Sequence, residues 1–269
     1  MDKDLYGGTG WTKLWAKLEQ QGNIGIDYCI NPVLYPEICR EINTTTAATV
    51  VDFGAGTNIL AIQFLFGYQD NIPGLKRCKD LTHAREKIKH FIGIEQSPSL
   101  VNEAKKYHRD LGYPNSILIK QQNLVANNKL PFGNSTLELA TSRNFLMHLN
   151  IKDLEFHMQE VARVLKPNSS YITAFLNPEY ELRKYTELTG KVLKNNERYS
   201  FAHGSKGENG TFYHYFKTSK QYENLFTKLF HIESITPCPP ITTEFRETHL
   251  RYYWKDCPMA YVYHLRAID

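Results

Sequence analysis

An apolar segment ending in an acid, a glycine turn and a second apolar segment follow one another between residues 48 and 66. Asp52 ends the first apolar segment, Gly54 and Gly56 form the turn, and residues 59–65 have the composition of a helix. Glycines let the backbone approach a ligand closely, and an acid at the end of a strand accepts hydrogen bonds from it. The pattern therefore predicts a strand, a turn and a helix of an α/β fold, with a site for a nucleotide-like ligand at the turn.

The bulk properties of the chain restrict its class. Its 269 residues suit one large domain, or one domain with a small cap. A formal net charge of +4 is too small to indicate a nucleic acid or a membrane as partner. The five cysteines form no Cys-x-x-Cys pair, so we expect free thiols and no metal site. The first residues are polar and no apolar segment reaches the ~20 residues that span a bilayer, which predicts a cytoplasmic protein.

Strand-like and helix-like segments alternate after residue 47. Apolar runs typical of buried strands are found at 48–53, 90–95, 116–120, 136–142 and 170–176. Helix-like segments lie between them, at 58–67, 98–110 and 151–165. Asn150 is placed to cap the last of these helices, and Lys166-Pro167-Asn168 to end it. The alternation predicts an α/β fold whose sheet is mostly parallel.

Both ends of the chain depart from this alternation. The N-terminal part contains an amphipathic helix at 11–21 and a second helix at 33–42, directly after Pro32. The last third is predicted to contain a polar helix at 178–196, an extended region at 199–216, a helix at 219–229 capped by Thr218, and strands at 230–236 and 258–266. We expect these two late strands to form an antiparallel edge that finishes the sheet.

Four blocks in the chain follow one another in a recognisable order. They are the acid-x-Gly-x-Gly turn at 51–58, the strand 91–95 ending in Glu95, the segment 121–135 with Leu130-Pro131-Phe132, and the Arg-Val-Leu-Lys-Pro turn at 163–167. This succession resembles the class I S-adenosylmethionine-dependent methyltransferases, specifically their small-molecule branch. The resemblance covers roughly residues 45–180.

The resemblance implies S-adenosylmethionine as the cofactor and assigns residues to it. The glycine loop would lie along the methionine half of the cofactor, with Asp52, Gly54, Ala55, Gly56 and Asn58. Glu95 would accept the ribose hydroxyls, with Gln96 beside it. Asn123 would accept the adenine amino group and Leu124 would cover the ring. Arg143 and Asn144, which follow the fourth strand, complete the expected cofactor site.

The sequence departs from the family pattern in two places. Asn58 stands where a third glycine is usual, and asparagine tolerates unusual backbone angles better than most residues. Glu95 comes 43 residues after Asp52, which leaves a long insertion at 67–90. Basic residues in this insertion are Lys76, Arg77, Lys79, His83, Arg85, Lys87 and Lys89. They form either a patch for an anionic substrate or RNA, or a solvated helix and loop whose charge is diluted by acids.

Methyl transfer from a sulfonium needs alignment and exclusion of water, and a base only when the acceptor arrives protonated. His148 and His214 are our candidates for a catalytic base. Candidate substrate contacts are Tyr28, Phe145, His148, His203 and Tyr215. Each of these residues has packing as its alternative role. Asn177-Pro178-Glu179-Tyr180 resembles the Asn-Pro-Pro-Tyr motif of amino-methyltransferases, but it follows strand five and lacks the second proline, so we interpret it as a turn.

The sequence therefore predicts a Rossmann-like, doubly wound, mostly parallel sheet with an antiparallel C-terminal edge and an N-terminal helical cap. The cap spans 1–44 and the methyltransferase domain 45–269, in which the segment 178–217 covers the substrate. The expected function is methyl transfer to O, N or C of a small molecule, with no membrane partner and nucleic acid disfavoured. The alternatives are a nucleic-acid methyltransferase, a non-catalytic member that binds cofactor or protein, and an NAD-binding protein.

Overall fold

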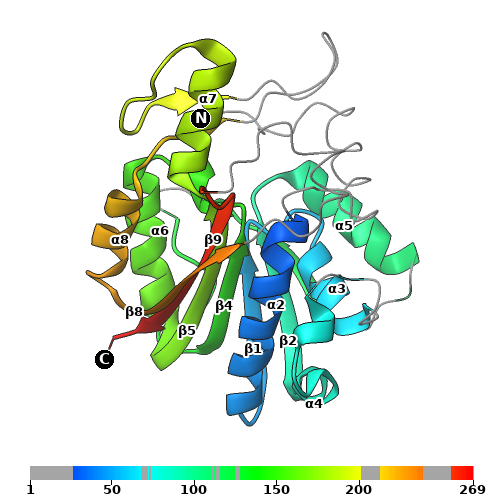
Figure 1. Cartoon of the computed structure of the whole chain (residues 1–269). Coiled ribbons are helices and arrows are strands. Elements are labelled where there is room, and N and C mark those ends of the chain that lie inside the picture. Colours follow the sequence, from blue (N-terminus) through cyan, green and yellow to red (C-terminus); the bar gives the residue numbers. More distant parts are fainter. Residues whose placement is uncertain are drawn as a thin grey trace.

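The structure is a computed structural model that describes residues 27–67, 72, 74–110, 112, 116–124, 128–200, 213–238 and 256–268. Seven strands form one sheet in the order β3-β2-β1-β4-β5-β9-β8 (Figure 1). They are β1 Ala48–Phe53, β2 Ile88–Glu95, β3 Ile117–Gln121, β4 Leu137–Arg143, β5 Leu165–Leu176, β8 Phe230–Cys238 and β9 Ala260–Ala267. Strands β1 to β5 are parallel, and β9 is antiparallel to β5 and β8. The predicted mostly parallel sheet with an antiparallel C-terminal edge is confirmed.

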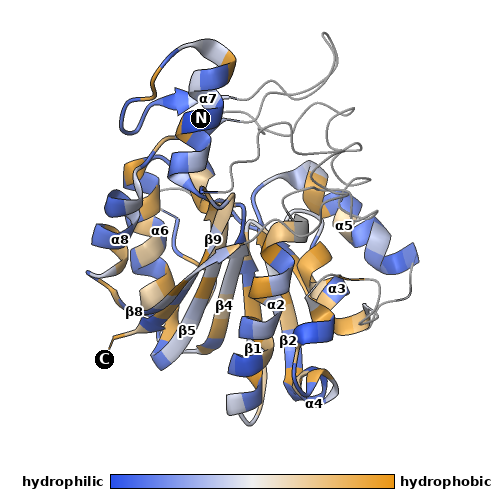
Figure 2. Ribbon diagram, viewed as in Figure 1, coloured by the Kyte–Doolittle hydropathy of each residue, from blue (hydrophilic) through white to orange (hydrophobic). Residues whose placement is uncertain are grey.

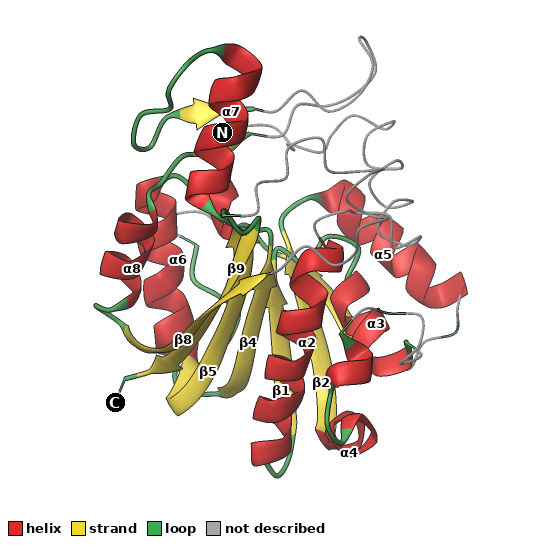
Figure 3. Ribbon diagram, viewed as in Figure 1, coloured by secondary structure: helices red, strands yellow, loops and turns green. Residues whose placement is uncertain are grey.

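Helices cover both faces of this sheet (Figure 3). Helices α2 (Asp27–Thr44), α3 (Ile59–Phe66) and α4 (Leu81–Lys87) share one buried apolar cluster, beside which α5 (Pro98–Asp110) packs on β3. Helices α6 (Ile151–Val164) and α8 (Ser219–Phe226) bury their apolar sides in a second cluster. Figure 2 shows apolar residues concentrated in the strands and in the helix sides that face them, while α5 is hydrophilic on its outer side. The chain thus forms three layers, with helix, sheet and helix.

Several element boundaries differ from the sequence-based expectation. Helix α2 begins at Asp27 and continues through Pro32 and Pro36, so Pro32 does not mark its start. Helix α7 spans Pro178–Thr189 and ends at Gly190, whose φ of 70° forms a left-handed cap, so the prediction of a helix to 196 is wrong. The expected helix at 11–21 lies outside the described residues.

The two predicted N-caps are confirmed. The side chain of Asn150 accepts a hydrogen bond from the backbone N–H of Asp153 at 3.0 Å, which satisfies one free donor at the start of α6. Thr218 and Gln221 form a capping box at the start of α8. Helix α6 ends at Val164, and strand β5 begins at Leu165, five residues earlier than expected.

The insertion between α3 and β2 contains a helical turn, η1 (Leu75–Arg77), and α4. Leu75, Leu81 and Ala84 are buried against α2, so the insertion is part of the core. Arg85 donates to the carbonyl oxygens of Phe64 and Gly67 at 2.7 and 2.6 Å, and Lys87 donates to that of Asn43 at 2.7 Å. Helix α4 lies at the end of the sheet where the parallel strands begin (Figure 1). The side chains of Arg85 and Lys87 therefore bind backbone carbonyl oxygens of α3, the residue after it, and α2.

All five cysteines are buried and carry free thiols, as expected. In the part of the chain that the structure describes, no helix combines the length and the apolar character needed to cross a membrane.

Candidate active site

The glycine turn after β1 is built from residues in left-handed backbone conformations. Gly54, Gly56 and Asn58 have φ values of 68°, 57° and 63°. The N–H groups of Gly54 and Ala55 both donate to the carbonyl oxygen of Ile94, at 2.9 and 3.2 Å. The turn is thereby fixed to the end of the neighbouring strand β2, as a ligand site at the carboxyl edge of a parallel sheet requires.

Glu95, the last residue of β2, lies beside this turn. One carboxylate oxygen accepts the N–H of Gly56 at 3.0 Å, and the other accepts the N–H of Ser97 at 2.8 Å. The side chain is buried. Each carboxylate oxygen has two lone pairs, so one N–H contact does not by itself use up its capacity as an acceptor. A carboxylate in this position fits the ribose of S-adenosylmethionine.

Asn58 is completely buried, and its side chain is directed into the sheet. Its Nδ2 donates to the carbonyl oxygen of Leu118 on β3 at 3.1 Å. A Cβ atom on Gly93 would come within 2.7 Å of Asn58 Oδ1, so the absence of a side chain at Gly93 makes this packing possible. Asn58 therefore links the start of α3 to β2 and β3, and its backbone provides the last left-handed residue of the turn.

Asp52 joins β1 to β4 directly behind the turn. Its Oδ1 accepts the hydroxyl proton of Thr141 at 3.0 Å, and the side chain is buried. After β4, Arg143 donates to Asn31 of α2 at 3.0 Å. Asn144 has a φ of 55° and donates its N–H to Ala174 on β5 at 2.7 Å. Three predicted cofactor residues therefore also fix the strands and α2 around the site.

The residues predicted to hold the adenine follow β3. The N–H of Gln122 donates to the carbonyl oxygen of Glu95 at 2.9 Å, so this loop starts beside the expected ribose position. Leu124 is buried, Asn123 is exposed and Gln96 is partly exposed. The structure thus brings the predicted ribose and adenine residues to neighbouring positions, and their roles toward the cofactor stay predictions.

The two candidate catalytic histidines lie against each other. His148 belongs to the turn η2 (Leu146–His148), and His214 to the short strand β7 (His214–Tyr215), which pairs with β6 (Arg198–Tyr199). Their ring centres are 4.8 Å apart in an edge-to-face arrangement. Burial lowers the pKa of His148 to about 3, and its Nδ1 lies 2.9 Å from the carbonyl oxygen of Tyr213. His148 is therefore neutral at neutral pH.

Three residues of this cluster were missed by the sequence analysis. Glu181 on α7 lies 2.7 Å from Nδ1 of His214, and the Tyr199 hydroxyl lies 3.4 Å from the same atom. Lys217 is almost completely buried and donates to the carbonyl oxygens of Leu149 and Tyr215, both at 2.7 Å. Burial lowers the pKa of Lys217 to about 7. No local pattern marks these residues, because the pairing of Glu181 with His214 spans 33 positions.

The remaining predicted substrate residues are placed as follows. The ring of Phe145 is buried against the glycine turn, and Tyr215 is partly buried in β7. Tyr28 lies in α2, and its side chain is not among those described. His203 lies outside the described residues.

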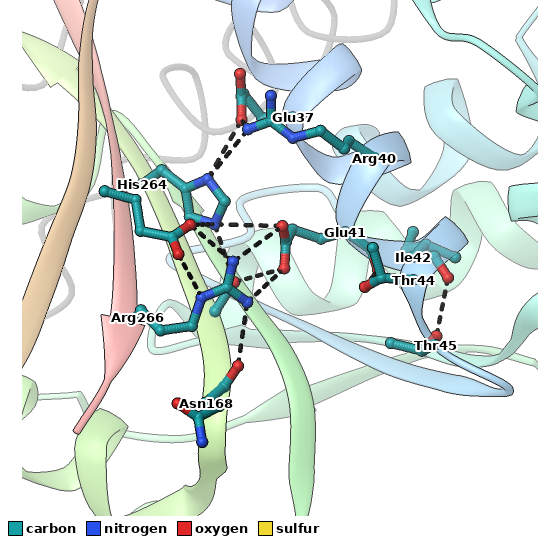
Figure 4. Close-up of polar contacts among 11 residues, drawn as sticks. Glu37, Arg40, Glu41, Ile42, Thr44, Thr45, Asn168, His264 and Arg266 are labelled. Carbon is teal, nitrogen blue, oxygen red and sulfur yellow. Dashed lines mark hydrogen bonds and ion pairs between the residues drawn. The ribbon is translucent and has the colours of Figure 1, made fainter. Parts of the chain in front are cut away.

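A second polar cluster lies between α2 and the antiparallel edge (Figure 4). Glu41, Glu233 and His264 bring possible metal ligand atoms within 4.8 Å of one another. Arg266 donates to Glu41 at 2.9 Å and to Glu233 at 2.7 Å, so its guanidinium pairs with both carboxylates. Ser170 lies 2.9 Å from His264 Nε2 but is completely buried. The cluster is an ion-pair network that attaches α2 to β5, β8 and β9.

Comparisons with known proteins agree with this geometry. A family model described as a methyltransferase domain matches residues 75–173, which contain Glu95 and the segment from β2 into β5. No curated protein matches the chain. The structure is similar to an S-adenosylmethionine-dependent methyltransferase from Clostridium acetobutylicum, with 13% identity, 96% and 98% of the two chains covered and a TM-score of 0.61.

Two further solved structures share the fold. A complex between the Haloferax volcanii Trm112 methyltransferase activator and a methyltransferase matches with 12% identity, 96% coverage of each chain and a TM-score of 0.58. Geranyl diphosphate C-methyltransferase from Streptomyces coelicolor, in complex with S-adenosyl-L-homocysteine, matches with 13% identity, 83% and 70% coverage and a TM-score of 0.52.

The sheet order, the glycine turn and the acid at the end of β2 define the class I methyltransferase fold. The chain therefore has the fold of the class I methyltransferases, and its residues 75–173 match a methyltransferase domain. S-adenosylmethionine, the cofactor expected from the sequence, would supply an electrophilic methyl group at this site.

Proposed function

We propose that the protein transfers the methyl group of S-adenosylmethionine to a small-molecule acceptor held over the carboxyl ends of β1, β4 and β5. The contact that carries the proposal is the 3.0 Å hydrogen bond between the N–H of Gly56 and the Glu95 carboxylate. This hydrogen bond fixes Glu95, which would accept the ribose hydroxyls, beside the glycine turn. Alignment of this kind is the main task of the protein in a direct displacement.

The surroundings of the turn favour a small acceptor. Phe145 contacts Gly54, and His148 follows three residues later. The ring of His148 contacts that of His214, and His214 contacts Glu181. Phe145, His214 and Glu181 are buried, and His148 is partly buried. A compact wall of aromatic and imidazole rings suits a ligand enclosed by the protein, since small-molecule sites are mostly apolar with a few placed polar groups.

The basic insertion gives little support to a nucleic acid acceptor. Arg85 and Lys87 are bound to backbone carbonyls, and α4 lies at the end of the sheet opposite Glu95 (Figure 1). A nucleic acid methyltransferase requires cations that track phosphates toward the site. Geranyl diphosphate C-methyltransferase, whose fold is similar, provides a case in which this fold serves a small acceptor.

Calorimetric titration with S-adenosylmethionine tests the cofactor site. We expect wild-type protein to bind and Glu95→Ala to lose at least about tenfold in affinity, because a hydrogen bond to a charged group contributes about 1.5–3 kcal/mol. Glu155→Ala is the matched control, since Glu155 is exposed on α6. No binding by folded wild-type protein would contradict the proposal and favour a non-catalytic scaffold.

The acceptor class is tested separately with methyl-labelled S-adenosylmethionine. Wild-type protein is incubated with a total metabolite extract or with total RNA, and the label is followed in each. We expect the label in the small-molecule fraction. Label confined to RNA would overturn the small-molecule assignment while leaving the cofactor site intact.

A further inference from the structure

The insertion at 67–90 contains a cysteine that has no part in the proposed function. Cys78 directly follows the helical turn η1, and its thiol is hydrogen-bonded to that of Cys39 on α2. Cys39 Sγ also lies 3.0 Å from the carbonyl oxygen of Lys79, the residue after Cys78. Two thiols that are 39 positions apart in the sequence therefore lie in contact.

Polar contacts on both sides fix the positions of the two sulfur atoms. Asn43, one turn after Cys39 in α2, donates from Nδ2 to Cys39 Sγ at 3.7 Å and to the Lys79 carbonyl oxygen at 3.2 Å. Cys78 Sγ lies 3.4 Å from the carbonyl oxygen of Gly74. The contact between the thiols is thus part of the packing of the insertion on α2.

The two thiols differ in acidity. The hydrogen bond from Cys78 is the main cause that lowers the pKa of Cys39 below its ordinary value. The positive charge of Arg85 and the amide of Asn43 lower it further, while burial and the charge of Asp80 oppose them. The pKa of Cys78 is raised, first by its hydrogen bond to Cys39 and then by burial. Cys39 is therefore the thiol that more readily becomes a thiolate, the form that reacts with oxidants.

The thiol pair lies close to the surface of the insertion. Arg77 and Lys79, on either side of Cys78, are exposed. Cys78 itself is 7% exposed and Cys39 is 1% exposed. A local opening of this short segment gives a small oxidant such as hydrogen peroxide access to both sulfur atoms.

We propose that Cys39 and Cys78 form a reversible disulfide that links the insertion to α2 on exposure to a peroxide. The Cys39 thiolate attacks one oxygen of hydrogen peroxide, the O–O bond breaks, and a sulfenic acid and a hydroxide ion form. The Cys78 sulfur then attacks that of Cys39, the S–O bond breaks, and the hydroxyl group leaves with the Cys78 proton as water. Two thiols and one peroxide thus give one disulfide and two molecules of water, and a small thiol reverses the reaction by exchange.

The first test identifies the disulfide in the full-length wild-type protein. The protein is incubated with a slight excess of hydrogen peroxide, alkylated with N-ethylmaleimide in urea, and cleaved after glutamate residues without reduction. Cleavage after Glu37 places Cys29 and Cys39 in different peptides. By mass spectrometry we expect one dominant linked pair, between the Cys39 and Cys78 peptides, which is lost on treatment with dithiothreitol.

Two results of this experiment would overturn the proposal. One is a dominant disulfide that involves Cys29, Cys238 or Cys257, the three remaining buried thiols. The other is the absence of a linked pair after treatment, with Cys39 and Cys78 either alkylated or oxidised to sulfinic acid. Both results come from wild-type protein, so they do not depend on whether a cysteine variant folds.

The second test compares the melting temperatures of the oxidised and the reduced protein. We expect oxidation to raise the value by at least about 4 °C, because the bond closes a long loop of the unfolded chain. The rise should be absent in Cys78→Ser. The control is Cys257→Ser, which should keep the rise, because Cys257 is buried and accepts a hydrogen bond from Asn177 instead.

An equal rise in Cys78→Ser would show that another site is responsible, and the proposal would be wrong. It would also be wrong if oxidised wild-type protein melted at the temperature of the reduced form, since the bond would then not hold the insertion on α2. Neither test involves S-adenosylmethionine or an acceptor, so their outcomes are independent of the proposed function.

Discussion

The ring of Phe145 lies directly on Gly54. A Cβ atom at Gly54 would come within 2.5 Å of Phe145 Cδ2, and the φ of Gly54 is 68°. Two features therefore require a glycine at the first position of the turn. Its backbone is in the left-handed region, and the aromatic ring of Phe145 fills the place of a side chain. The contact joins the cofactor turn to the segment that leads to His148.

Gly54→Ala should lower both the stability of the protein and its affinity for S-adenosylmethionine. The left-handed backbone costs an alanine about 1–2 kcal/mol, and displacement of the Phe145 ring adds about 1–3 kcal/mol. Gly190→Ala is the control, because Gly190 has a φ of 70° with no atom within 4 Å of its Cβ position. Urea denaturation and calorimetry measure the two losses. Equal losses in both variants would show that the Phe145 contact is not important.

The fold could be predicted because its signals are local. Each parallel strand is an apolar run, and each expected N-cap is an asparagine or a threonine that binds its own helix. The Arg163 side chain also shows why two of the motif blocks occur together. Arg163 donates to the carbonyl oxygens of Phe132 and Leu130 at 3.0 and 3.3 Å, so the Arg-Val-Leu-Lys-Pro block holds the Leu-Pro-Phe block.

The rest of the site depends on contacts between distant segments. The sequence places Asn58 in the turn, but only the structure shows that its side chain extends beneath Gly93 to β3. Likewise, His214 was chosen as a catalytic candidate, whereas its partner Glu181 lies 33 positions away on α7 and was not chosen. Long-range pairs of this kind leave no periodicity in a single sequence.

The pair of Glu160 with Arg163 should stabilise the fold at neutral pH, and this contribution should be lost in acid. Arg163 holds the pKa of Glu160 below its usual range, helped by the N–H of Leu130 at 2.8 Å. A depressed carboxylate pKa stabilises the fold above the unfolded value of about 4.3, and this contribution is lost as pH falls through the lower folded value. Glu160→Gln should therefore cost about 1–3 kcal/mol at pH 7 and less below pH 4, in urea denaturation. A cost that is the same at both pH values would contradict this account.

His157 should destabilise the protein in acid. Its ring lies between Phe53 and Phe145, with ring centres 5.1 Å from each, and neither ring nitrogen has a hydrogen-bond partner among the described residues. Burial lowers its pKa to about 3. The unfolded chain binds a proton below about pH 6.5 and the folded chain does not, so stability falls as pH drops from there toward 3.

His157→Met should remove this loss and stabilise the protein relative to wild type by about 2 kcal/mol at pH 5. The pH-dependent part of this difference should shrink toward zero above pH 7. The control is His83→Met, because His83 is exposed on α4. Stability curves at pH 5 and pH 8 decide the question. A His157→Met variant whose difference from wild type does not change with pH would show that this imidazole is charged or partnered in the folded protein.

Arg266 should be one of the main residues that hold α2 on the sheet. Its guanidinium donates to Glu41 and Glu233, and only 10% of the Glu41 side chain is exposed (Figure 4). Arg266→Met leaves the Glu41 carboxylate buried without its cation. Breaking a buried pair costs about 3–5 kcal/mol, and we expect about 2–4 kcal/mol because Arg266 itself is partly exposed.

Arg183→Met provides the matched comparison. Arg183 pairs with Asp256 at 3.0 Å, but both side chains are largely exposed, so its loss should be clearly smaller. In the double variant Glu41→Gln/Arg266→Met the uncompensated charge is removed as well, and we expect it to recover part of the stability lost in Arg266→Met. Urea denaturation of the four proteins measures these differences. If Arg266→Met costs no more than Arg183→Met, and the second substitution recovers nothing, packing of α2 alone attaches it to the sheet.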